Sequence, residues 1–241
     1  MRHSGAVGIE VAAELKVNNP HIHVTLVHSR DQLLSNEPLP AEFKDRARIV
    51  MEEEGVEVLL GQRAKVYDTK EGDLKRVELT NGTIIEAGAV IQATAKCPPN
   101  TEALSKQVLD ADGYVKILAN LNFPTDAPNN TFHSAIGDIC AWSGIKRAGG
   151  AMHMGQVAAV NIWANILNSE DETLKLGHVE LPDWPNVMGL AVGKQALGYG
   201  GPGTEVTYGT QTLAEIFGDD LAWSSEFSES GCTREHCANV V

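Results

Sequence analysis

The sequence lacks several features that would place it in common classes of protein. No uninterrupted apolar run reaches the roughly 18 residues that a membrane-spanning helix needs. The first residues carry Glu10 and Glu14 and show no basic segment followed by an apolar block, which argues against a signal peptide. The net charge is −13, and the scattered lysines and arginines form no basic patch, which argues against nucleic acid as a partner. We therefore expect a soluble, cytoplasmic protein.

Cysteine is also scarce, and its spacing excludes a second kind of chemistry. None of the four cysteines forms a Cys-x-x-Cys pair, so a redox-active disulfide of that type is excluded and reduced thiols are expected. Cys232, His236 and Cys237 lie close together near the C-terminus. Zinc takes four ligands at characteristic spacing, and no second pair lies nearby, so we interpret this cluster as a solvated tail. No metal site is predicted.

The first part of the chain alternates between helical and extended patterns. Residues 5–17 have apolar positions at helical spacing and end at an Asn-Asn-Pro stop, and residues 23–27 form an apolar run rich in β-branched residues. A second helix is predicted from Leu39 to a C-terminal Gly55, and a second buried strand over residues 56–60. This alternation is typical of an α/β fold in which helices cover a parallel sheet, a Rossmann-like three-layer domain.

The pattern changes after Gln62. Residues 76–86 predict a β-hairpin around Asn81-Gly82, a pair that suits a type I′ turn, and residues 89–94 predict a further buried strand. Residues 149–167 predict a long helix with apolar side chains available for burial, namely Val157, Val160, Ile162 and Ile166. Short strands broken by glycines follow over residues 187–223.

Gly5-x-x-Gly8 at the start of the first helix matches the second half of a dinucleotide-binding fingerprint. Gly5 would let the backbone approach a pyrophosphate, and Gly8 would let the helix pack on a strand, whereas His3 occupies the first glycine position. The alternative is a pair of glycines that only help the helix to pack. His28 stands where the ribose-binding residue belongs, and Arg30 either accepts a 2′-phosphate or is a solvated loop cation.

At this point the residues resemble a known family. Residues 4–15 and 24–29, the block Ala135-Ile-Gly-Asp-Ile139, and the stretch from Lys146 through His153 are similar to apoptosis-inducing-factor-like and ferroptosis-suppressor-like flavoproteins of the pyridine nucleotide-disulfide oxidoreductase superfamily. The ending at residues 218–224 resembles the C-terminal domain of fungal members.

This resemblance implies an enzyme that binds FAD and NAD(P)H and passes hydride to the flavin, then electrons to a quinone or similar small acceptor. It places Glu10 near the nicotinamide, as a catalytic residue, with a plain helix-surface glutamate as the alternative. Gly137 and Asp138 would hold the ribityl chain of FAD, although Asp138 also fits a turn or helix cap. Lys146 and His153 belong to the segment that brings a helix N-terminus under the flavin.

The resemblance also divides the chain. We expect an NAD(P)H-binding domain over residues 1–105, a segment of the FAD-binding domain over 106–170, and a small α+β C-terminal domain over 171–241. The family's first FAD-binding half is expected to be missing, so FAD should bind weakly or not at all. The alternative is a catalytically inactive remnant that acts through protein interaction, for example as a homodimer. Peripheral association with mitochondria or lipid surfaces is an alternative location.

Overall fold

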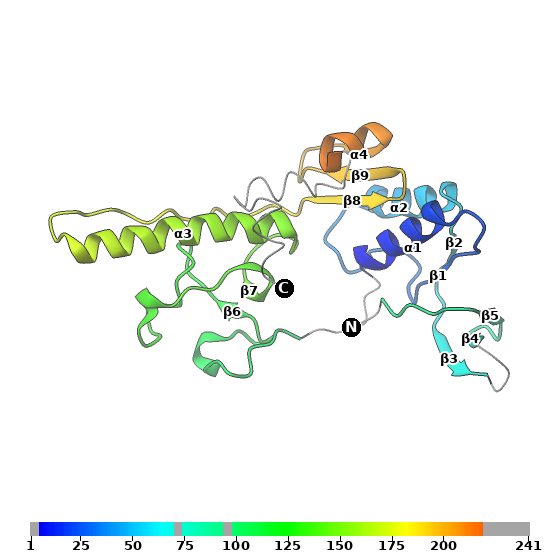
Figure 1. Cartoon of the computed structure of the whole chain (residues 1–241), viewed down its shortest axis with the longest axis horizontal. Coiled ribbons are helices and arrows are strands. Elements are labelled where there is room, and N and C mark those ends of the chain that lie inside the picture. The colour runs from blue at the N-terminus through cyan, green and yellow to red at the C-terminus, as the bar shows by residue number, and fades with distance from the viewer. Residues whose placement is uncertain (1–4, 70–73, 94–97, 219–241) are drawn as a thin grey trace, which may run out of the picture. The chain divides into compact units, whose positions relative to one another are not determined.

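The computed structural model describes residues 5–69, 74–93 and 98–218 (Figure 1). His3, the Cys232–His236–Cys237 cluster and nearly all of the 218–224 motif lie outside these residues. The described residues fall into two compact units. Of the described residues, 5–69, 74–93 and 187–218 belong to the first unit and 98–186 to the second.

The first unit begins with the predicted alternation of helix and strand. Helix α1 (Ala6–Asn18) leads to strand β1 (Thr25–Val27), and helix α2 (Ala41–Glu53) leads to strand β2 (Glu57–Leu59). β1 and β2 are parallel, with Leu26 opposite Val58. Parallel neighbours need a crossover connection, which α2 supplies. The predicted parallel arrangement of these two strands is confirmed.

Helix α2 illustrates why these segments fold as predicted. Its apolar positions recur at helical spacing, so Phe43, Ala47, Val50 and Met51 all lie fully buried on one face. Burial of a large apolar side chain contributes about 1.5–3 kcal/mol, which makes this face the main support of the helix. Gly55 then adopts a φ of +86°, which allows the chain to turn into β2.

A three-stranded antiparallel meander follows, formed by β3 (Ala64–Asp68), β4 (Lys75–Leu79) and β5 (Ile84–Ala87). The hairpin between β4 and β5 is confirmed, but its predicted type I′ turn is wrong. Only Gly82 has a positive φ, +86°, whereas a type I′ turn needs positive φ at two consecutive residues. The chain instead forms a three-residue loop with Gly82 in the left-handed position, which matches a type I turn followed by a bulge.

The strand expected over residues 89–94 is not present in its described part. Residues 89–93 form no strand, and Val90 and Ile91 are 37% and 61% exposed. The expectation rested on apolar composition, which becomes a buried strand only where a neighbouring strand and a covering layer exist. Among the described residues, no strand pairs with this segment.

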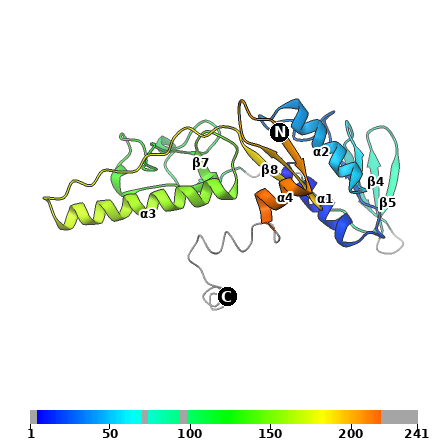
Figure 2. The ribbon, with the colours of Figure 1, turned by 90° about the horizontal axis from the view of Figure 1, so that it is seen from above.

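The C-terminal part of the first unit packs against its helices. Strands β8 (Met188–Val192), β9 (Gln195–Tyr199) and β10 (Val206–Gly209) form an antiparallel sheet in the order β10-β9-β8, and helix α4 (Thr210–Phe217) lies against β9 (Figure 2). β8 contacts α1, and β9 contacts α2. The two N-terminal helices α1 and α2 therefore pack against this C-terminal sheet as well as against β1 and β2.

The second unit contains mainly irregular chain packed against one long helix. Its elements are η1 (Lys106–Val108), β6 (Val115–Lys116), η2 (Asn130–Phe132), η3 (Gly137–Ile139), β7 (Cys140–Ala141) and α3 (Ala148–Glu170). β6 and β7 pair in parallel. Helix α3 confirms the long helix that the sequence predicts over residues 149–167.

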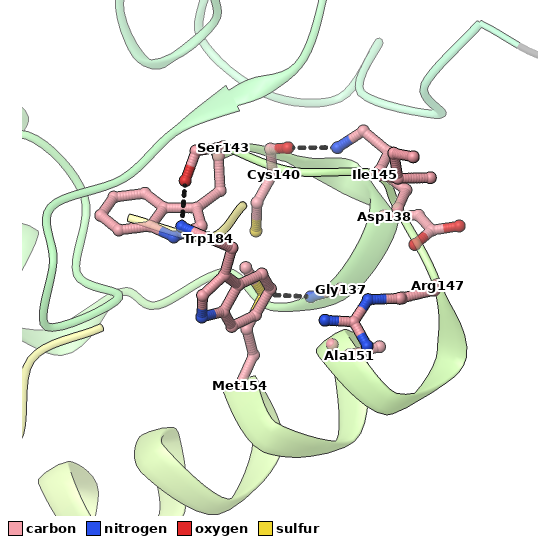
Figure 3. A pocket seen from close by; sticks show the side chains of 12 residues that line it. Gly137, Asp138, Cys140, Ser143, Ile145, Arg147, Ala151, Met154 and Trp184 are labelled. Carbon is pink, nitrogen blue, oxygen red and sulfur yellow. Dashed lines mark hydrogen bonds between the residues drawn. The ribbon is translucent and has the colours of Figure 1, made fainter. Parts of the chain in front are cut away.

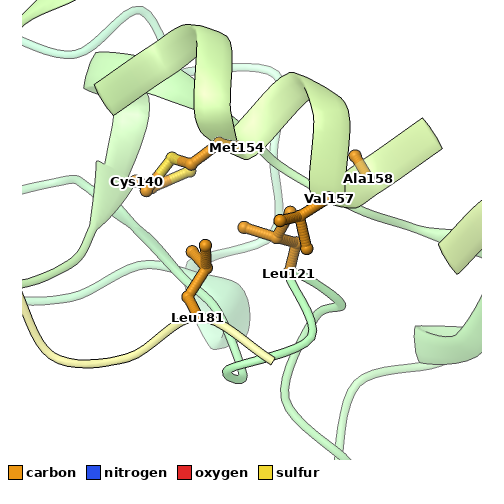
Figure 4. Packing of buried hydrophobic residues seen from close by; sticks show 6 residues of the cluster. All are labelled: Leu121, Cys140, Met154, Val157, Ala158 and Leu181. Carbon is orange, nitrogen blue, oxygen red and sulfur yellow. The ribbon is translucent and has the colours of Figure 1, made fainter. Parts of the chain in front are cut away.

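One apolar cluster holds the loops of the second unit to α3 (Figure 4). Its buried members are Leu121, Cys140, Met154, Val157, Ala158 and Leu181. Asn161, 2% exposed, adds polar links: its side-chain amide donates to the carbonyls of Asn120 (3.1 Å) and Val179 (2.9 Å) and accepts from the Val179 N–H. This buried amide is satisfied on both its donor and acceptor sides, so it fixes the loops in register with the helix.

The predicted burial of α3 is only partly correct. Val157 is buried, but Val160, Ile162 and Ile166 are 52%, 49% and 43% exposed. The helical spacing of these residues is correct, yet in the second unit the loops cover only the face that carries Met154, Val157 and Asn161. No helix among the described residues is long and apolar enough to cross a membrane.

Candidate functional site

The start of α1 places the two fingerprint glycines as the sequence predicts. Gly5 is the N-cap in an extended conformation, and nothing lies within 4 Å of the position where a Cβ would stand. The Gly8 N–H donates to the Gly5 carbonyl at 3.1 Å, and Gly8 itself is buried. Among the residues that the structure describes, no side-chain hydrogen bond caps the helix, so its first N–H groups form an electropositive end.

Glu10 lies one turn into α1, where its carboxylate accepts a hydrogen bond from the backbone N–H of Ala191 in β8. Burial raises the pKa of Glu10 above its ordinary value, and the nearby charge of Glu14 adds to this, while the Ala191 hydrogen bond opposes it. The C-terminal sheet therefore fixes the direction of this side chain, an interaction that sequence reasoning did not find.

His28 and Arg30 follow the end of β1. The His28 backbone is tied to β2 and the chain after it, donating to Leu59 O at 2.8 Å and accepting from Gln62 N at 3.0 Å. Its side chain is buried, and burial lowers the pKa of His28, so the imidazole is neutral at pH 7. Arg30, by contrast, is exposed.

Three of the four flavin-site residues predicted in the second unit line one pocket at the N-terminus of α3 (Figure 3). Gly137, Asp138 and Lys146 contribute to its walls. Gly137 has a φ of +76° and passes close to α3, since a Cβ there would lie 3.5 Å from that of Ala151. Its N–H donates to the sulfur of Met154 at 3.1 Å, which ties the predicted motif to the helix.

The pocket carries charges of both signs. Asp138 is exposed on η3, and the Lys146 ammonium donates to the backbone carbonyl of Cys140 and lies 4.4 Å from the centre of the Tyr114 ring. Burial lowers the pKa of Lys146, an effect that the negative charge of Asp138 opposes. Arg147 is the N-cap of α3 and lines the same pocket.

Cys140 also lines this pocket but is poorly suited to thiol chemistry. It is fully buried, and burial raises the pKa of its thiol to about 11, although Lys146 partly opposes the shift. A thiol is nucleophilic only as its thiolate, and very little thiolate exists at pH 7 with such a pKa. Its place in the apolar cluster gives it a packing role.

His153, the fourth predicted residue, is exposed and does not line the pocket. Its ring lies 6.1 Å from that of Trp184, which does line it. Sequence reasoning missed Trp184, Trp142 and Ser143, because they come from a loop and a later extended segment with no recognisable motif. The open space in the pocket measures about 20 Å³, room for about one water molecule. A flavin ring is far larger, so it could contact this site only at the mouth.

A larger hollow, of about 460 Å³, lies between β2 and the β4–β5 hairpin in the first unit. His23 Nε2 and Glu57 Oε2 meet at 3.0 Å on its wall, and the Thr25 hydroxyl donates to the same carboxylate oxygen at 2.8 Å. None of the predicted site residues lines it. Among the described residues, no group of His, Cys, Asp or Glu side chains is arranged to hold a metal ion.

The arrangement of the elements is shared with flavoprotein reductases of known structure. An FAD-dependent pyridine nucleotide-disulphide oxidoreductase from Desulfovibrio vulgaris superposes with a TM-score of 0.61 at 19% identity, over 81% of this chain and 47% of that one. At this identity the likeness establishes a mixed α/β fold similar to that of FAD- and NAD(P)-binding reductases.

The sequence model of the pyridine nucleotide-disulphide oxidoreductase family matches residues 4–155, and the chain belongs to this family. Oxidoreductase OXR1 of Ajellomyces capsulatus is 45% identical over 228 residues, which cover 91% of this chain and 48% of that protein. Ferroptosis suppressor protein 1 of Mus musculus is 31% identical over 172 residues, 68% of this chain and 43% of that protein. The chain thus spans about half the length of these relatives, and the resemblance drawn from the sequence is confirmed.

Proposed function

We propose that this chain takes part in an FAD-dependent NAD(P)H oxidoreductase reaction, in which hydride passes from NAD(P)H to the flavin and electrons then pass to a quinone-like small molecule. The observation that carries the proposal is the gathering of Gly137, Asp138 and Lys146 around the N-terminus of α3, in a chain of this family. The flavin supplies the hydride-accepting chemistry, and the protein supplies binding and orientation.

In this proposal the first unit binds NAD(P)H. The uncapped start of α1 and the open space beside Gly5 suit a pyrophosphate, which is stabilised by backbone N–H groups and the positive end of the helix. Neutral His28 and exposed Arg30 would lie toward the adenosine ribose, with Arg30 able to pair with a 2′-phosphate. Glu10, held by Ala191, would position the nicotinamide.

The second unit would hold the flavin. The Asp138 carboxylate is exposed at the pocket and can accept hydrogen bonds from ribityl hydroxyls, which charge assistance strengthens. Lys146, Arg147 and the N-terminal N–H groups of α3 place positive charge beside it, which suits a ring that gains electron density on reduction. The donor set thus fits a flavin, with the ring at the mouth of the pocket.

The proposal is tested by purifying residues 1–241, titrating FAD and recording visible absorption, then following NAD(P)H oxidation with a water-soluble quinone. We expect saturable flavin binding and oxidation that depends on added FAD. A folded protein that binds no flavin at the highest FAD concentration would reject the proposal.

A second candidate, action through protein interaction, is favoured by one observation. Val160, Ile162, Trp163 and Ile166 expose 43–61% of their surface along α3, which is an unusual amount of apolar surface for one helix. The same flavin titration separates the two candidates, because an interaction protein would show no FAD-dependent oxidation.

A further inference from the structure

The pocket at the N-terminus of α3 includes two aromatic side chains that the motifs of the family resemblance do not contain, Trp142 and Trp184. Trp184 comes from the extended segment after α3, more than forty positions after the Gly137-Asp138 motif, yet it lines the same pocket. It is half-buried and packs against the apolar cluster of the second unit.

Two hydrogen bonds fasten this segment to the loop after β7. The Trp184 backbone N–H donates to the Ser143 hydroxyl oxygen at 2.7 Å, and the Trp142 indole N–H donates to the Pro182 carbonyl at 3.2 Å. In Figure 3 the dashed line from Ser143 marks the first of these bonds, and the Trp184 indole lies between this anchor and α3. The chain is therefore anchored at Trp184 itself and two residues before it.

Two glycines provide the space that this indole occupies. A Cβ at Gly150, in the first turn of α3, would stand 3.0 Å from a ring carbon of Trp184. Gly144 has a φ of +80°, and a Cβ there would lie 3.0 Å from the Cβ of Trp184 and 3.1 Å from the Pro185 carbonyl oxygen. Larger residues at either position would displace the indole, so the chain is shaped to bring it against the helix N-terminus.

We propose that Trp184 is a ring-binding residue of the flavin site, the aromatic wall against which the isoalloxazine packs at the pocket mouth. The inference rests on the proposed function, because it adds a residue to the same site. With about 20 Å³ of open space inside, the pocket cannot enclose the ring, which can only pack from outside against the side chains that line it, and the Trp184 indole is one of these. An indole offers a large, rigid apolar surface that favours offset or tilted contact with another aromatic ring.

The test uses FMN, which carries only the ring, ribityl and phosphate portions, titrated into wild-type protein, Trp184→Leu, Trp184→Phe and Trp163→Leu. Trp163 is the matched control, since it is a tryptophan on α3 that is 61% exposed and does not line the pocket. We expect FMN to bind about tenfold more weakly to Trp184→Leu, whereas Trp184→Phe and Trp163→Leu stay near wild type. Contact with an indole quenches flavin fluorescence by electron transfer. Bound FMN should therefore fluoresce weakly in the wild-type protein and more strongly in both Trp184 variants.

A second pair of variants leaves the indole intact. Gly150→Ala should push the ring aside and brighten bound FMN, whereas Gly155→Ala, with nothing within 4 Å of its Cβ position, should not. Equal affinity and equal emission in wild type and Trp184→Leu would overturn the assignment of Trp184 alone. Absence of saturable FMN binding to the wild-type protein would overturn it together with the proposed function.

Discussion

At the scale of single residues, the environment assigns different properties to groups that look alike in the sequence. Glu10 and Asp138 are both acids beside helix N-termini, yet Glu10 is held in a partly buried position by β8 and Asp138 is exposed at a pocket. The sequence predicted a site role for Asp138 because the motif that contains it, residues 135–139, is a short continuous segment. It could not predict the Ala191 hydrogen bond to Glu10, which joins residues far apart in the chain.

The raised pKa of Glu10 has a consequence for stability. A carboxyl whose pKa is higher in the folded state binds protons more readily there, so its contribution to stability is full below its ordinary pKa of 4.5 and is lost as pH rises through the folded-state value. We expect the free energy of unfolding of Glu10→Gln, relative to wild type, to increase as pH is raised from 4 to 7.

Urea unfolding of both proteins across this range measures the difference, and Glu14→Gln serves as the control for loss of a neighbouring charge. A difference that stays constant with pH would show that Glu10 titrates alike in the folded and unfolded chain.

At the scale of elements, the sequence predicted which segments form helices and strands. It did not predict which of these segments other parts of the chain cover. The alternation α1–β1–α2–β2 followed from helical spacing, β-branched runs and the Gly55 stop, all of which act within a few residues. The burial of residues 89–93 and of Val160 on α3 was mispredicted, since burial depends on what packs against a segment. Likewise, Asn81-Gly82 marked the hairpin, but the turn type depended on the φ of Asn81, which is not positive.

The packing of the C-terminal sheet on the N-terminal helices is tested at the turn between β8 and β9. Gly193 has a φ of +61°, and a Cβ there would lie 2.7 Å from Val17 Cγ2 in α1 and 3.2 Å from the Glu54 carboxylate. We expect Gly193→Ala to destabilise the protein by about 1–3 kcal/mol through this overlap, in addition to backbone strain.

Gly203→Ala is the matched control, because Gly203 also has a positive φ, +87°, but nothing lies within 4 Å of its Cβ position. The stability of Gly203→Ala should therefore fall only by the cost of backbone strain. Equal losses in urea unfolding for the two variants would contradict contact between the β8–β9 turn and α1.

At the scale of the whole molecule, each of the two units carries its own candidate binding feature. The first unit presents the uncapped start of α1 with Gly5 and Gly8, and the second presents Asp138 and Lys146 at the start of α3. The division of the sequence into NAD(P)H-binding, FAD-binding and C-terminal domains at residues 105 and 170 stays a prediction, and so do the roles of these residues. Family membership, by contrast, was readable from short motifs because their combination is specific.

The most direct measurement is the dissociation constant of FAD for the 241-residue chain and for Asp138→Ala, by equilibrium dialysis. The account predicts saturable binding to wild type and a loss on the order of ten- to a hundredfold in Asp138→Ala, since each charge-assisted hydrogen bond contributes about 1.5–3 kcal/mol. Asp171→Ala, which removes an exposed aspartate at the other end of α3, should bind like wild type. Equal FAD affinity in Asp138→Ala and Asp171→Ala would contradict a flavin site at the N-terminus of α3.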